Sequence, residues 1–148
     1  MKTILLLLMA LAAGGMVAVQ GTVNSGLSKR LNHPLQASLI SFVGAIPFII
    51  LILLILHPKL PAWSQLRAIP PLYCTGGIYG AIFVTTILFL ASKIGIANTV
   101  VATIVGQLIV SVIFDHIGFL GLAVKPINIY RAIGCVGLLI SLYLIHKT

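Results

Sequence analysis

Apolar residues fall into five long stretches along this chain, covering residues 3–24, 35–56, 72–91, 94–114 and 127–145, and Arg131 is the only charged residue within them. Each stretch has about 20 residues, the length that an α-helix needs to cross a hydrocarbon core of ~30 Å. Lipid cannot hydrogen-bond the backbone, and the alternation typical of barrel strands is absent, so these spans should be helical. We predict an all-α membrane protein in which residues 1–148 form a single five-helix transmembrane domain.

The composition supports a membrane protein and excludes a water-soluble one. Hydrophobic residues make up 60% of the chain, charged residues only 7%, and the mean hydropathy is +1.22. Soluble domains carry roughly 25% charged residues, which they need to cover their surface. The lipid bilayer is therefore the expected solvent of this protein.

A formal net charge of +8 raises the question of nucleic acid binding. Such binding needs a clustered basic face, whereas the basic residues here occur singly or as the one pair Lys29–Arg30. Basic residues between apolar spans ordinarily set topology and contact anionic lipid head groups. We expect no nucleic acid partner.

The first residues, "MKTILLLLMALAAGG", resemble a signal peptide, with one lysine, an apolar stretch and then small residues. The apolar character continues to Val19, beyond the roughly 7–15 residues of a typical signal-peptide core. We interpret this segment as an uncleaved first transmembrane helix.

The basic residues are divided almost evenly between the two sides of the membrane. With five crossings, one side carries Lys2, Lys59, Arg67, Lys125 and Arg131, and the other carries Lys29, Arg30, Lys93 and Lys147. This difference of one residue is almost no orientation signal. One interpretation is a single orientation decided by the Lys29–Arg30 pair. The other is dual topology, in which oppositely inserted copies, or a copy and an oppositely oriented homologous partner, pair with an axis in the membrane plane.

Small residues recur at the spacing of helix contacts in several spans. Such residues let helices approach closely in lipid, although glycine is common in membrane helices. The candidate helix-packing positions are Gly14, Gly76, Gly80, Gly106 and Gly134. The pattern does not distinguish contacts within one chain from contacts between subunits.

Among the amide side chains within the spans, the candidates are Gln20 and Asn24, four residues apart on one helix face, and Gln107 in the second half of the fourth span. Burying an amide without a partner is costly. One reading is interhelical hydrogen bonding, often worth under ~1 kcal/mol per bond. The other is a polar lining for a substrate cavity.

Asp115 is the only acidic residue of the chain, and it lies at the end of the fourth span. A carboxylate at a helix C-terminus is unfavourable with the helix dipole, so a cation such as Arg131 or Lys125, or a lysine of a facing subunit, should compensate it. A structural salt bridge and a proton- or cation-coupling role both stay open. The neighbouring His116 could titrate near neutral pH, but the other three histidines also lie near span ends, which favours an interfacial residue.

The chain lacks the residues of an enzyme active site. One acid cannot build a carboxylate pair or a multi-metal site, and neither HExxH nor GxSxG occurs. The spacing of Cys74 and Cys135 suits no metal site. We therefore expect neither enzymatic activity nor a metal or cofactor.

Three segments of the chain resemble the YdcZ-like family of the drug/metabolite transporter superfamily: "VQGTVNSGLSKRLNHPLQASLISFVGAIP", "YCTGGIYGAIFV" and "KIGIANTVVATIVGQLIVSVIFDHIGFLGLAVKPINIYRAIG". The "GQ…DH-G--G…KP---R--G" run is the most specific part, while "PPLY" departs from the Trp-rich approach expected before the third span. The positions that match the family signature are Gln20, Asn24, Gly106, Gln107, Asp115, His116, Gly118, Gly121 and Arg131.

The resemblance implies a short protein of the bacterial inner membrane that forms half of a ten-helix drug/metabolite transporter-like bundle. It would pair as an inverted homodimer or with a sister protein. We predict a secondary transporter that exports small metabolites or toxic compounds. Gln20, Asn24 and Gln107 would line its cavity, and Asp115, His116 and Arg131 are the coupling or gating candidates. The alternative is a non-transporting membrane subunit that stabilises or regulates a partner.

Overall fold

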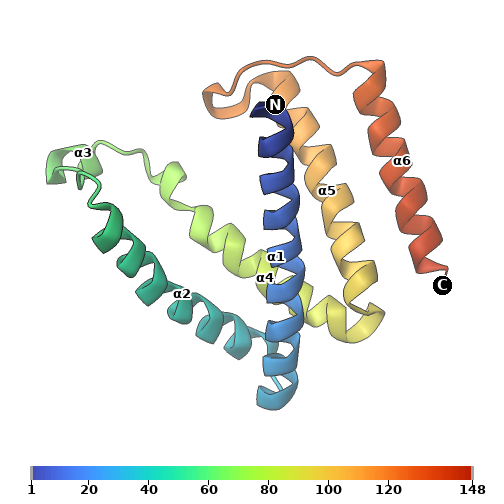
Figure 1. Ribbon diagram of the computed structural model, residues 1–148, viewed down its shortest axis with the longest axis horizontal. Helices are drawn as coiled ribbons and strands as arrows, with labels where there is room; N and C mark the ends of the chain where they lie inside the picture. The colour runs from blue at the N-terminus through green and yellow to red at the C-terminus, as the bar shows by residue number, and fades with distance from the viewer. Residues whose placement is uncertain (1, 148) are drawn as a thin grey trace. The chain divides into compact units, whose positions relative to one another are not determined.

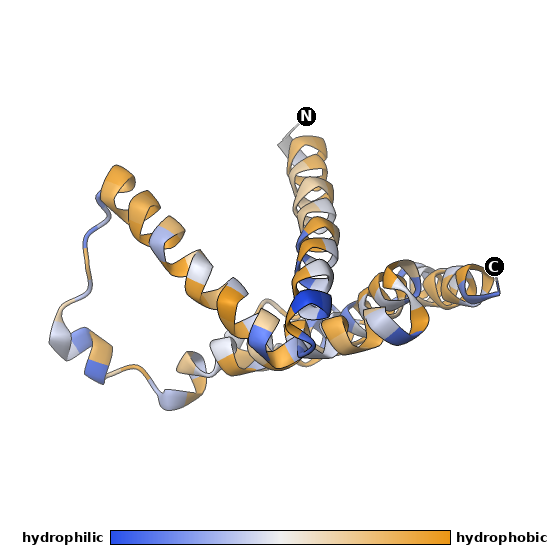
Figure 2. Cartoon of the chain, turned by 90° about the horizontal axis from the view of Figure 1, so that it is seen from below, coloured by the Kyte–Doolittle hydropathy of each residue, from blue (hydrophilic) through white to orange (hydrophobic). Residues whose placement is uncertain are grey.

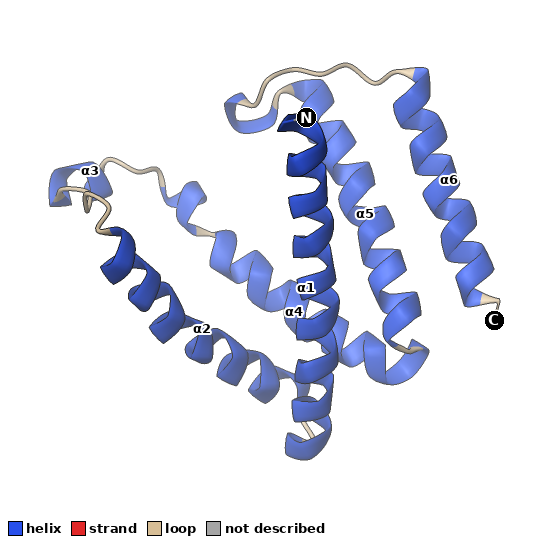
Figure 3. Cartoon of the chain, viewed as in Figure 1, coloured by secondary structure: helices blue, strands red, loops and turns tan. Residues whose placement is uncertain are grey.

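A computed structural model of the chain describes residues 2–147, apart from the side chain of Lys2 (Figure 1). Five of its helices are long and apolar enough to cross a membrane, and the residues described contain no strand (Figure 3). The predicted all-α membrane fold with five spans is therefore confirmed. The elements are α1 (Lys2–Leu31), α2 (Pro34–Leu56), α3 (Trp63–Arg67), η1 (Pro71–Cys74), α4 (Gly76–Ile94), α5 (Ile96–Ile117), η2 (Phe119–Gly121) and α6 (Ile129–His146).

The first helix is longer than the predicted span 3–24, because it continues to Leu31. Its last turn contains Lys29 and Arg30, and cations are favourable at the negative end of the helix dipole. Pro34 sets the end of α1, since the residue before a proline avoids the helical region. His33 is accordingly extended, with φ −153° and ψ 117°, and Asn32 is left-handed, with φ 56°.

The breaks on either side of α5 depend on glycines with positive φ. Gly95, with φ 82°, separates α4 from α5, and Gly118, with φ 65°, ends α5 three residues later than the predicted span end at 114. A left-handed glycine after a helix is a common stop signal, because glycine has no Cβ to clash there. α6 begins at Ile129, where the side chain of Asn128 accepts a hydrogen bond from Arg131 N at 3.0 Å.

The chain divides into two compact units, residues 1–89 and 90–148. In the first unit α1 packs along α2, and α4 contacts both helices through the residues described below. Its buried apolar residues are Ala37 of α2 with Ile87 and Leu88 of α4. Apolar residues cover most of the surface of these helices, as expected of lipid-facing segments (Figure 2).

The short helix α3 lies in the connection between α2 and α4. The Arg67 guanidinium lies over the ring of Trp63, 5.2 Å from its centroid, and the Trp63 side chain is exposed. An exposed tryptophan beside a basic residue fits the depth of the lipid head groups. This arrangement is consistent with a connection that lies at the membrane interface.

The second unit consists of the end of α4 with α5 and α6, which pack against each other. The connection between them contains η2 and an irregular segment at residues 122–128. Leu120 and Gly121 both have positive φ, at 54° and 83°. The rings of Phe114 and Phe119 stack at 4.4 Å and hold the turn against the end of α5.

The turn after α5 should be sensitive to side chains at its glycines. A Cβ at Gly118 would lie 2.8 Å from Val124 Cγ2, whereas a Cβ at Gly121 would meet nothing within 4 Å. Gly121→Ala should therefore carry only the left-handed backbone cost of about 1–2 kcal/mol. Gly118→Ala should carry this cost and the steric clash as well. Reversible unfolding in detergent micelles measures both, and Gly137→Ala, in a helix with open space around it, is the control. Equal stability of all three variants would contradict the geometry of this turn.

Candidate functional site

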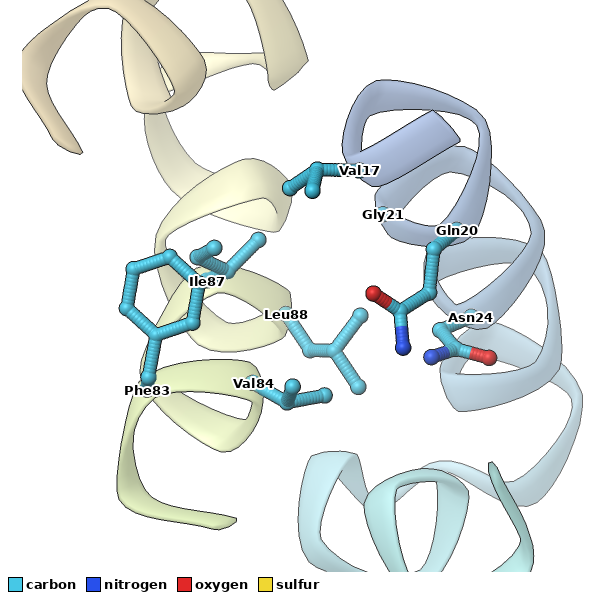
Figure 4. A pocket seen from close by; sticks show the side chains of 8 residues that line it. All are labelled: Val17, Gln20, Gly21, Asn24, Phe83, Val84, Ile87 and Leu88. Atoms are coloured by element: carbon cyan, nitrogen blue, oxygen red, sulfur yellow. The ribbon is translucent and has the colours of Figure 1, made fainter. Parts of the chain in front are cut away.

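Gln20 and Asn24 line a small cavity between α1 and α4, with Gly21 beside them and apolar side chains of α4 opposite (Figure 4). Their four-residue spacing puts both amides on one face of α1, as predicted. In Figure 4 the Gln20 amide lies toward Leu88 of α4. The cavity volume is only about 10 Å³, and a single water molecule needs roughly 10–15 Å³ by this measure. In this state the cavity is too small for a substrate.

Asn24 is buried at 6% exposure and links two helices of the first unit. Its Nδ2 donates to Ser41 Oγ of α2 at 2.9 Å. This contact matches the interpretation of a packing hydrogen bond between helices. The cavity-lining interpretation also stands, because Asn24 contacts the same cavity as Gln20.

A second polar contact in this unit was missed by the sequence analysis. The Thr85 hydroxyl of α4 donates to Ser38 Oγ of α2 at 2.9 Å, and Ser38 Oγ donates to the carbonyl of Pro34 at 3.1 Å. Ser38 and Ser41 are three residues apart in a mostly apolar helix, so they share a face of α2. That spacing was the available signal, and it places the start of α2 in polar contact with both α1 and α4.

In the second unit Asp115 forms an ion pair with Arg131, one of the cations that its position at a helix end led us to consider. Arg131 Nη2 of α6 donates to Asp115 Oδ2 of α5 at 3.0 Å, with side-chain exposures of 26% and 35%. Arg131 lies in the first turn of α6, so the ion pair joins the start of α6 to the end of α5. This contact offsets the unfavourable position of Asp115 in the last turn of α5.

The ion pair belongs to a larger set of hydrogen bonds that fixes the irregular segment 122–128. Lys125 N donates to the Asp115 carbonyl at 2.7 Å, and Arg131 Nη1 donates to the Lys125 carbonyl at 3.1 Å. Ile127 N donates to His116 Nδ1 at 3.3 Å. We call the side chains of Asp115, His116, Asn128 and Arg131, with the backbone of 125–127, the α5–α6 clasp.

His116 has a structural contact within the clasp. Because its Nδ1 accepts the hydrogen bond of Ile127, this nitrogen must carry a lone pair and the ring proton lies on Nε2. Lys125 and Asn128 also take part in the clasp, although only Lys125 was considered from sequence, as a cation for Asp115. The Asn128 side chain caps α6, and asparagine before an apolar run was the signal for it.

A larger cavity lies beside the ion pair, between α5 and α6. Its volume is about 230 Å³, and its wall on α5 consists of residues spaced along one helix face, ending at Asp115. Arg131 and Gly134 form the wall on α6. The lining residues are Leu108, Ser111, Val112, Asp115, Arg131 and Gly134.

The remaining candidate residues lie away from these contacts. Gln107 is exposed on α5 in the second unit, so it does not share a described cavity with Gln20 and Asn24, and its lining role stays a prediction. A Cβ at Gly80 would lie 3.6 Å from the Phe42 ring, an ordinary packing distance between α4 and α2. A Cβ at Gly14, Gly76, Gly106 or Gly134 would meet no atom within 4 Å, and a role of these four glycines in helix packing stays a prediction.

Residues that could bind a metal are not grouped in the described part of the chain. No cluster of three or more His, Cys, Asp or Glu side chains occurs among residues 2–147, and Cys74 and Cys135 are free. The polar groups that the structure brings together are amides, hydroxyls, the His116 ring and one ion pair.

A family described as "Putative inner membrane exporter, YdcZ" matches residues 5–144 of the chain. The match includes both cavities and the whole α5–α6 clasp. Comparison with curated proteins and with solved structures gives no match.

The hydrogen bond between α1 and α2 can be tested by removing either partner. Asn24→Ala and Ser41→Ala should each destabilise the protein by about 0.5–1 kcal/mol, the size typical of hydrogen bonds between membrane helices. The double variant should cost no more than the larger single one, because the two share one bond. Thermal unfolding in micelles is the measurement. Thr22→Ala is the control, since the Thr22 hydroxyl bonds only to the Ala18 carbonyl of its own helix. Additive losses would contradict the contact.

Proposed function

Because the chain belongs to the YdcZ inner membrane exporter family, we propose that it is a secondary transporter that exports small metabolites or toxic compounds as an antiparallel dimer. It is a multi-pass protein of the inner membrane. The observation that carries the proposal is the ion pair between Asp115 and Arg131, which joins the two long helices of the second unit at their ends. It is a contact that can open and close within a membrane bundle.

The strength of this pair suits a gate. Ion pairs that remain partly exposed are worth about 1 kcal/mol or less. A substrate contact or a shift of a partner subunit can offset an energy of that size. The clasp would hold segment 122–128 in place while the pair is closed, and would release it when the pair opens. Alternating access needs such a contact, which breaks and reforms between two states.

The small buried core of the chain supports an assembly of two copies. α2 buries only Ala37 and Ser38, and α6 buries no residue. The described cavities are correspondingly small or open. A transport pathway that excludes lipid needs more enclosing surface than these helices provide, and a second five-helix copy would provide it.

The distribution of basic residues supports an inverted arrangement of the two copies. Lys29, Arg30 and Lys93 lie in the last turns of α1 and α4, and Lys147 follows α6. These four are balanced by five on the opposite side, including Lys59 and Arg67 in the connection from α2 to α4. With a difference of one, neither orientation is strongly preferred.

Asp115→Asn tests the gate, because it keeps the shape of the side chain and removes its charge. We expect transport to fall by about fivefold, equivalent to ~1 kcal/mol of altered gating energy, while dimer assembly stays intact. Growth on a panel of toxic compounds identifies a transported one, and its efflux from proteoliposomes gives the rate. The charge-swapped double variant Asp115→Arg with Arg131→Asp should recover part of the activity. Lys59→Gln, outside the clasp, is the control. Full transport by Asp115→Asn would exclude a gating role.

Reporter fusions after residue 148 test the inverted arrangement. A cytoplasmic fluorescent reporter and a periplasmic phosphatase should both give signal from the natural sequence. Lys29→Gln with Arg30→Gln leaves two basic residues against five, so the C-terminal reporter should then be active only in the periplasm. The control variant, Lys147→Gln with Lys59→Gln, removes one basic residue from each side and should leave both reporter signals unchanged. Signal from one compartment in the natural protein would instead favour a non-transporting subunit or an oppositely oriented partner.

A further inference from the structure

We infer that the cavity between α5 and α6 is a binding site for an organic anion, whose carboxylate or phosphate competes with Asp115 for Arg131. This inference rests on the proposed transport function and adds the chemical class of the substrate. It begins with the Arg131 guanidinium, which lines the cavity and is one-quarter exposed.

Arg131 has unused hydrogen-bonding capacity at the cavity. A guanidinium carries five N–H donors in a planar fork that fits a carboxylate or a phosphate in bidentate geometry. Two bonds are made within the described chain, from Nη2 to Asp115 and from Nη1 to the Lys125 carbonyl. The donors left over can bind a second anion, or take the place of the Asp115 contact when an anion arrives.

The wall of the cavity supplies one further polar group and a larger apolar surface. The Ser111 hydroxyl lies one helical turn before Asp115 and makes no hydrogen bond to any residue that the structure describes. Leu108 and Val112 form the apolar part of the same wall. A ligand with an anionic head and an apolar body would match both parts of the cavity.

The charges around the cavity favour an anion over a cation. Asp115 is the only acid in the sequence, and Arg131 already neutralises it. Lys125, whose backbone bonds to both members of the pair, is a further basic residue of the α5–α6 clasp. A cationic ligand would find no uncompensated carboxylate here, while an anion would enter a region with excess positive charge.

Gly134 provides the means to close the cavity without touching the ion pair. A Cβ at this position would meet no atom within 4 Å, so a leucine side chain can occupy the open space opposite Ser111. Gly137 lies one turn further along α6, is equally open, and does not line the cavity. Gly134→Leu and Gly137→Leu are therefore a matched pair.

The experiment uses the full chain in an uncharged, lipid-free detergent and three probes of similar size: benzoate, benzamide and benzylammonium. Saturation-transfer NMR titrations should show benzoate binding, with affinity at least about tenfold above that of the other two. Gly134→Leu should weaken benzoate binding by about tenfold or more, and Gly137→Leu should leave it unchanged. Asp115→Asn should strengthen benzoate binding, because it removes the competitor for Arg131. Preferred binding of benzylammonium, or unchanged benzoate binding in Gly134→Leu, would overturn the inference.

Two further measurements complete the experiment. One tells whether the bound anion is a lipid head group or a free solute, and the other tells whether the anion site or the proposed transport function has failed. Nanodiscs of phosphatidylglycerol should weaken benzoate binding relative to nanodiscs of phosphatidylcholine if the resident anion is a lipid head group. Equal binding in both would assign the site to a free solute. Benzoate binding without transport of any screened compound would contradict the proposed function alone. Transport without Gly134-dependent benzoate binding would contradict the anion site alone.

Discussion

Every backbone hydrogen bond of this protein must be made within the protein wherever lipid surrounds it, and the structure follows from this constraint. The five long helices satisfy their own N–H and C=O groups. The difficult point is the connection from α5 to α6, where the backbone leaves helical geometry at the end of a span. There the Asp115 carbonyl, the His116 ring and the Arg131 guanidinium bond to the loop backbone. Asp115 therefore serves the fold through its backbone and its carboxylate together.

The two units place polar groups in different environments, with different consequences. In the first unit Asn24 and Ser38 are buried, and their bonds to Ser41 and Thr85 tie α1 and α4 to the start of α2. Polar groups buried in this way are expensive to separate, so this end of the unit should move as one piece. The ion pair of the second unit is partly exposed and costs less to open. If one of these contacts opens during transport, it should be the ion pair of the α5–α6 clasp and not the buried hydrogen bond between α1 and α2.

The imbalance between nine basic residues and one acidic residue bears on both the membrane orientation of the chain and the charge of the ligand it would bind. Basic residues divided almost evenly between the two predicted sides would remove the usual preference for one orientation. Asp115 already pairs with Arg131. Since it is the only acidic residue, no other side-chain carboxylate can bind a cation. An exporter built on this chain would recognise its ligand through donated hydrogen bonds and positive charge. Its acceptors would be amides, hydroxyls and backbone carbonyls.

The sequence by itself determined the class of protein, the five spans and the pairing of Asp115 with a nearby cation, because these depend on local hydrophobicity, helix length and helix dipoles. It set the end of α1 less well, since the apolar span ends at residue 24 whereas the helix continues through Lys29 and Arg30 to Leu31. The tertiary structure alone decided that Arg131 is the partner of Asp115, that His116 accepts from Ile127, and that Ser38 and Thr85 meet. These contacts join residues on different helices, and their distances depend on how the helices cross, which local sequence patterns do not specify.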